Sequence, residues 1–128
     1  MKPLSYLIIR LLLGASLFFH GLVRLPKLSA FAEGVTEEFA STLLPEMLAL
    51  PFGYFIPIAE FVAGLLLIIG FRTSKIALFV GFFMILLTVG TCFQENWGAL
   101  PSQFLHGILA VILYEFYERT EQRFSVKI

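Results

Sequence analysis

The chain has few of the residues on which soluble enzymes and metalloproteins rely. One of its 128 residues is a cysteine, Cys92, which excludes an internal disulfide, a CxxC redox pair and a cysteine-based metal cluster. Charged residues make up 14% of the chain, whereas a soluble domain has about a quarter. The formal net charge is zero, so the overall charge indicates no nucleic-acid partner. What remains is a chain in which 59% of the residues are hydrophobic.

The hydrophobic residues gather into four runs, each close to the roughly 20 residues that a helix needs to cross a bilayer. We place these spans at about residues 4–25, 51–70, 76–93 and 102–117. Together they leave no room for a soluble catalytic domain. The sequence therefore predicts an all-α fold, a single membrane domain over residues 1–128 built as a bundle of four transmembrane helices in contact with lipid.

The segment between the first two spans is interrupted by glutamates and is not a clean span. Four apolar residues in it recur at every fourth position: Phe31, Val35, Phe39 and Leu43. This spacing predicts a short amphipathic helix that lies in the membrane interface, with its acids toward water. The helix would be either a surface cover for the bundle or a lid over an outward-facing pocket. Pro45 and Pro51 predict a turn into the second span.

Basic residues are concentrated on one side of the four predicted spans. The N-terminus, the turn after the second span and the C-terminus share that side, which carries six of them: Lys2, Arg72, Lys75, Arg119, Arg123 and Lys127. The other side has Arg24 and Lys27. Because positive residues favour the cytoplasm, we expect both termini to be cytoplasmic.

Titratable residues inside the spans are the candidates for a buried polar site. Glu60 lies near the middle of the second span, where a carboxylate must be paired or protonated, so it is a functional-site candidate by default. At a rise of about 1.5 Å per residue, His20 and His106 lie at one depth in the outer half. Arg10 and Glu115 match in the inner half, which predicts an ion pair between them. Glu60 would then lie between two polar levels.

Three further charged residues are secondary candidates. Arg24 and Glu95 would lie above the histidine level, although Arg24 could instead extend to the water boundary. Arg72 lies in the basic turn after Gly70, which is a candidate helix stop.

One face of the first span carries small and polar residues at helical spacing: Arg10, Gly14, Leu17, Gly21 and Arg24. That face is either a packing stripe or a ligand or proton site, and no group of residues predicts a metal site.

The pattern of these residues resembles the DoxX family of bacterial inner-membrane proteins. The similarity rests on short motifs along most of the chain: Arg10-x-x-x-Gly14, His20-Gly21, Glu60-x-x-x-Gly64 and Gly70-x-Arg72-Thr73. Arg10, His20, Glu60 and Arg72 are the positions that match. The family takes its name from similarity to the DoxD subunit of a thiosulfate:quinone oxidoreductase. The resemblance thus implies a four-helix, multi-pass inner-membrane protein with a role beside a quinone-linked redox complex.

Two functions are consistent with these observations, and whether the protein is an enzyme stays open. The first is a small membrane subunit of a redox system that binds a quinone or relays protons, since histidines and acids at one depth suit that chemistry. A haem held by His20 and His106 is a less favoured version, because equal depth does not make the two rings face each other. The alternative is a non-catalytic accessory or assembly subunit that docks a larger membrane protein or a second copy. A transporter ranks last, because no inverted repeat is evident.

Overall fold

The computed structural model describes residues 1–120 of the chain, and the described part is helical with no strand. Five α-helices follow one another: α1 (Pro3–Arg24), α2 (Leu28–Phe39), α3 (Glu46–Ile69), α4 (Thr73–Phe93) and α5 (Leu100–Thr120). Short 3-10 turns join α1 to α2 and α4 to α5. Four of the helices are long and apolar enough to cross a membrane, so the predicted all-α fold with four spans is confirmed.

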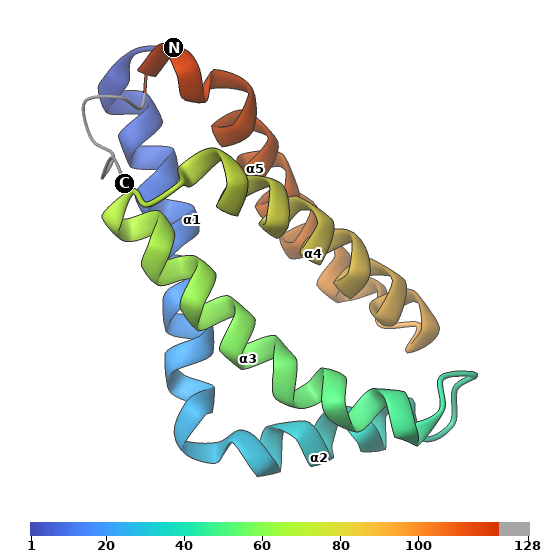
Figure 1. The fold of residues 1–128 in the computed structure, drawn as a ribbon. Coiled ribbons are helices and arrows are strands. Elements are labelled where there is room, and N and C mark those ends of the chain that lie inside the picture. The colour runs from blue at the N-terminus through green and yellow to red at the C-terminus, as the bar shows by residue number, and fades with distance from the viewer. Residues whose placement is uncertain (121–128) are drawn as a thin grey trace.

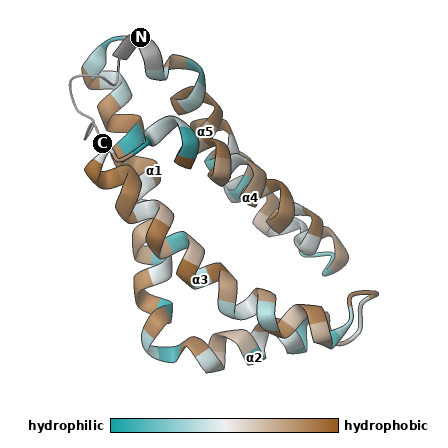
Figure 2. Cartoon of the chain, in the orientation of Figure 1, coloured by the Kyte–Doolittle hydropathy of each residue, from teal (hydrophilic) through white to brown (hydrophobic). Residues whose placement is uncertain are grey.

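The long helices form two pairs that meet at one end and diverge at the other (Figure 1). α1 packs along α3, and α4 packs along α5. The narrow end holds the N-terminus and the turn between α3 and α4, whereas the open end holds α2 and the turn between α4 and α5. Hydrophobic residues cover most of the four long helices, and hydrophilic residues gather at the turns and on α2 (Figure 2). This divergence of the two pairs creates the space in which the candidate site lies.

Two glycines allow α1 and α3 to cross with their backbones in contact. A Cβ atom on Gly21 would lie 2.5 Å from the backbone nitrogen of Phe61, and one on Gly64 would overlap the backbone of Phe18. Small residues at such crossings are typical of membrane helices, where close packing replaces the hydrophobic effect as the driving force. The glycines of the small-residue face on the first span therefore serve as a packing stripe.

The start of α3 differs from the sequence prediction. α3 begins at Glu46 and continues through Pro51 and Pro57. The prediction that Pro51 belongs to a turn before the second span was therefore wrong. Pro51 lies early in the helix, where it removes a single backbone hydrogen bond without ending the structure. The predicted helix stop at Gly70 is confirmed, because Gly70 adopts a left-handed conformation with φ of 76°.

α2 has the predicted amphipathic pattern, and it packs against the first half of α3. Its buried residues are Ala32, Val35 and Phe39, while its glutamates are exposed. Leu43, predicted to continue this face, lies beyond the end of α2 in an exposed turn. A membrane-interface position for α2 stays a prediction.

At the other end of the molecule, a hydrogen bond connects α1 to α5. The buried Tyr6 hydroxyl donates it to the carbonyl of Leu113 over 2.6 Å.

Candidate functional site

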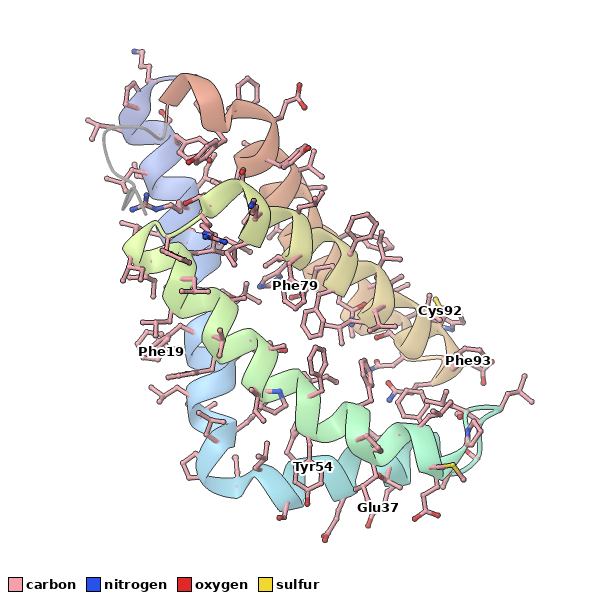
Figure 3. All side chains as sticks on the ribbon, viewed as in Figure 1. Phe19, Glu37, Tyr54, Phe79, Cys92 and Phe93 are labelled. Atoms are coloured by element: carbon pink, nitrogen blue, oxygen red, sulfur yellow. The ribbon has the colours of Figure 1, made fainter. Side chains whose placement is uncertain are left out.

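A polar cavity of about 440 Å³ lies between the two helix pairs toward the open end, and all five α-helices line it. Six polar residues in its lining carry the argument that follows: His20, Arg24, Glu38, Glu60, Gln103 and His106. Apolar residues such as Leu17, Ile56 and Leu87 complete the walls. Glu37 points outward from α2, Tyr54 extends from α3 toward α2, where its hydroxyl donates to Ser29, and Phe19 lies on the outer side of α1 (Figure 3). The cavity thus gathers polar groups from helices that otherwise present apolar side chains.

Arg24 and Glu60 form an ion pair in the cavity wall. Nη1 of Arg24 lies 3.3 Å from Oε2 of Glu60, and the Glu60 side chain is 7% exposed. The Arg24 guanidinium also lies over the ring of Phe31, 4.5 Å from its centroid, which adds a cation–π contact. The Arg24 side chain is 29% exposed, and its extension to the water boundary stays a prediction. α1 ends at Arg24, where the chain turns into α2, and this places the guanidinium within reach of α3.

His20 and His106 lie side by side, as their matching depths predicted, with ring centroids 6.2 Å apart and planes perpendicular. Ser16 joins them: its Oγ lies 2.8 Å from His106 Nε2 and 3.5 Å from His20 Nδ1. Each ring is also fixed by a backbone carbonyl of its own helix. His20 Nδ1 lies 2.5 Å from the Ser16 oxygen, and His106 Nδ1 lies 2.6 Å from the Ser102 oxygen. The two side chains thus belong to one hydrogen-bonded network across α1 and α5.

Gln103 forms a second polar connection, between α4 and α5. Its Nε2 donates a 2.7 Å hydrogen bond to Thr91 Oγ1, and its Oε1 accepts one of 3.3 Å from Thr88. At the rim of the cavity, Gln94 donates a 3.1 Å hydrogen bond to Glu38 and so links α4 to α2. Because α2 lines the cavity as well as packing on α3, it forms one of its walls.

Sequence reasoning missed Ser16 and Gln103, both of which contact the cavity network. A signal was present for each. Ser16 lies four residues before His20, and Gln103 lies three residues before His106, so each shares a helical face with its histidine. A hydroxyl or amide at that spacing from a membrane histidine is a candidate hydrogen-bond partner.

Arg10 and Glu115 are not brought together, although they were predicted to pair. Arg10 is buried in the N-terminal half of α1 and does not line the cavity, whereas Glu115 is exposed on α5. Within residues 1–120, no ion pair joins Arg10 to Glu115. The reason is the position of Glu115 around the helix axis. It follows the buried Leu113 by two residues, a rotation of about 200°, so its side chain lies on the side of α5 opposite the core.

The remaining secondary candidates lie in turns outside the cavity lining. Arg72 and Glu95 are exposed and have positive φ values of 47° and 56°.

His20 was predicted to be buried, but its side chain is exposed at the surface of the cavity. The described residues contain no group of three or more histidine, cysteine, aspartate or glutamate side chains that could hold a metal ion. Ser16 lies within hydrogen-bond distance of His106 Nε2, and a haem held by both histidines stays a less favoured prediction.

Comparison with known proteins gave one match. A model of the DoxX family matches residues 5–92, more than two thirds of the chain. The matched region runs from α1 nearly to the end of α4 and includes Arg10, His20, Glu60 and Arg72. It leaves out α5, which supplies His106 and Gln103 to the cavity. Neither a curated protein nor a solved structure matches the chain at a significant level.

Proposed function

Because the chain belongs to the DoxX family, we propose that it is a small integral membrane subunit of a redox system whose polar cavity binds the headgroup of a quinone. The observation that carries this proposal is the cavity itself. At about 440 Å³ it falls within the range of roughly 300–1,000 Å³ typical of small-molecule sites. It also lies between helices that are long and apolar enough to span a membrane, the environment in which a quinone dissolves.

The lining of the cavity supports a ligand with an apolar ring and polar oxygens at its edge. Leu17, Ile56 and Leu87 offer apolar surface for the ring. Arg24 offers N–H donors, of which one is used by Glu60 among the described contacts. A mostly apolar pocket with a few placed polar groups is the usual form of a small-molecule site, in which the polar groups fix orientation.

We also propose that the protein lies in the bacterial inner membrane with both termini in the cytoplasm. The six basic residues on the N-terminal side of the spans support this orientation, since cytoplasmic segments are enriched in lysine and arginine. The narrow end would then face the cytoplasm, and the cavity would lie in the outer half of the membrane.

Fluorescence of the single tryptophan gives a direct test of the quinone site. Trp97 lies beside Asn96 and two residues before Ala99, both of which line the cavity, so a bound quinone should quench it. Titration of the protein in lipid nanodiscs with a short-chain benzoquinone should give saturable quenching. The variant Arg24→Gln should weaken the apparent affinity about tenfold, because a hydrogen bond to a charged donor is worth about 1.5–3 kcal/mol.

The matched control is Tyr114→Phe, an exposed aromatic on α5 outside the cavity, which should titrate like the wild type. Quenching that rises linearly without saturation, and equally in all three proteins, would mean that the quinone only dissolves in the lipid. That result would contradict the proposed site.

A second candidate function is a non-catalytic accessory or assembly subunit. An apolar groove of about 750 Å³ on α4 and α5 favours it, because Gly81 and Gly107 leave space there for another helix. On this view, extraction in mild detergent yields a larger membrane-protein partner or a second copy in stoichiometric amount, with no quinone bound. Mass spectrometry of the purified complex distinguishes the two functions.

A further inference from the structure

We infer that the cavity prefers the reduced, hydroxyl-bearing form of its ligand, a quinol, and that Nε2 of His20 accepts a hydrogen bond from one of its hydroxyl groups. The inference rests on the proposed quinone site and adds to it the oxidation state of the ligand and the atom that recognises it.

Backbone carbonyls determine which nitrogen of each ring carries the proton. A carbonyl oxygen only accepts, so His20 Nδ1, at 2.5 Å from the Ser16 oxygen, must be the protonated nitrogen. The same reasoning places a proton on His106 Nδ1, at 2.6 Å from the Ser102 oxygen. In a neutral imidazole the other nitrogen, Nε2, then bears a lone pair and is an acceptor.

Ser16 supplies the donor that one of these acceptors requires. Its hydroxyl lies 2.8 Å from His106 Nε2 and donates its proton there. The Ser16 oxygen keeps its lone pairs, and these face the protonated Nδ1 of His20 at 3.5 Å. Every donor and acceptor in the network is thereby matched when both rings are neutral, with one exception. Within the described residues, no hydrogen bond reaches Nε2 of His20.

The position of His20 makes this acceptor available to a ligand. The side chain is exposed and lines the cavity, and Arg24 lies one helical turn further along the same face of α1. The cavity therefore offers a donor, the Arg24 guanidinium, and an acceptor, the His20 imidazole, on neighbouring positions. A ligand oxygen that both accepts and donates, as a hydroxyl does, can satisfy both groups.

Arg24 and His20 differ in what they can distinguish. The guanidinium donates to a quinone carbonyl or a quinol hydroxyl, so it contributes to the binding of both forms. The lone pair of His20 Nε2 accepts from a hydroxyl but faces the lone pairs of a carbonyl with no proton between them. Sites built to hydrogen-bond a hydroxyl discriminate against analogues that lack it, because a polar group is then left unpaired. His20 is thus the specificity-determining residue of the pair.

The test compares the two oxidation states of one ring under anaerobic conditions. Isothermal titration calorimetry of the protein in nanodiscs measures binding of tetramethyl-benzoquinol and tetramethyl-benzoquinone, which share shape and lack a long tail. The wild type should bind the quinol about tenfold more tightly, the factor that corresponds to one net hydrogen bond. In His20→Phe the ratio of the two affinities should fall to about one, because the acceptor that distinguishes quinol from quinone is removed.

A second variant tests whether a hydrogen-bond acceptor at position 20 is enough for the quinol preference. His20→Gln retains an acceptor oxygen and should keep a part of the quinol preference, whereas Tyr114→Phe should keep all of it. Equal wild-type affinity for the two forms, or an undiminished preference in His20→Phe, would overturn the inference and leave the quinone site standing. Failure of the wild type to bind either form would overturn the quinone site and the inference together.

Discussion

Arg24 and Glu60 are separated by 35 residues of sequence, yet Nη1 of one lies 3.3 Å from Oε2 of the other in the wall of the cavity. Arg24 ends α1, Glu60 lies in the middle of α3, and Phe31 of α2 covers the guanidinium. The pair therefore connects three helices at the point where the bundle begins to open. A carboxylate within a membrane-spanning helix is costly unless paired, which gives this contact a structural as well as an electrostatic role.

Removing one partner of this pair should have unequal effects. Arg24→Gln leaves the buried Glu60 without its cation and should lower the free energy of unfolding by about 3 kcal/mol, the lower end for a broken buried pair. Glu60→Gln should cost less, because Arg24 remains 29% exposed and in contact with Phe31. Reversible unfolding in mixed micelles measures each loss. A double variant, Arg24→Met with Glu60→Met, should lose less than the sum of the two single changes. Strictly additive losses would argue against a coupled pair.

The α1–α3 crossing predicts a large penalty for a single methyl group. Gly21→Ala places a Cβ within 2.5 Å of Phe61 and Pro57 backbone atoms, and Gly64→Ala overlaps the backbone of Phe18. Because backbone atoms cannot move aside as a flexible side chain does, each change should cost about 2–3 kcal/mol, at the upper end for overpacking. The same unfolding measurement in micelles applies.

Gly81→Ala is the matched control for this prediction. No atom lies within 4 Å of the position that its Cβ would occupy, and it also lies inside a membrane-spanning helix. We expect it to be neutral or slightly stabilising, since alanine favours helix more than glycine does. Similar losses at Gly64 and Gly81 would show that helix propensity, and not the close crossing, dominates.

How far the sequence predicts this site can be seen from the two histidines and the predicted inner ion pair. Depth along a helix follows from residue count alone, so the equal depth of His20 and His106 could be predicted from the sequence. Facing is harder, because it depends on helical phase and on which pairs of helices contact each other. Glu115 has a depth close to that of Arg10 but points away from the core, and this is why depth alone gave a wrong pair.

The cavity itself was beyond sequence reasoning. Residue counts along the spans carry no information on the angle between helix pairs, and α4 and α5 diverge from α1 and α3 toward one end (Figure 1). That divergence leaves space between the pairs, and α2 forms a further wall of the cavity at the open end. Arg24 reaches Glu60 because α1 ends beside α3, with which it packs. Hydrophobic periodicity predicts each helix and its apolar face, but the angle between helix pairs is set by side-chain shapes at their contacts.

The orientation of the chain gives a third prediction. If the basic side is cytoplasmic, a green fluorescent protein fused after residue 128 should be fluorescent, and an alkaline phosphatase fused there should be inactive. A fusion within the α4–α5 turn, next to Trp97, should show the reverse pattern. Replacing Arg72 and Lys75 with glutamine in the α3–α4 turn should weaken the preference, because these two residues supply part of the charge bias. An active phosphatase at the C-terminus would contradict the cytoplasmic placement.

The histidine network gives the last prediction, which is independent of any ligand. Since the chain has two histidines, ¹⁵N-histidine labelling yields a spectrum from His20 and His106 alone. In the neutral form each ring should carry its proton on Nδ1, because each Nδ1 lies within hydrogen-bond distance of a backbone carbonyl. Ser16→Ala removes the hydroxyl that donates to His106 Nε2 but keeps the backbone oxygen that holds His20 Nδ1. The Nε2 resonance of His106 should therefore shift in Ser16→Ala, while the Nδ1 resonance of His20 should hardly change. Protons on Nε2 in either ring would contradict the hydrogen-bond pattern from which the acceptor role of His20 follows.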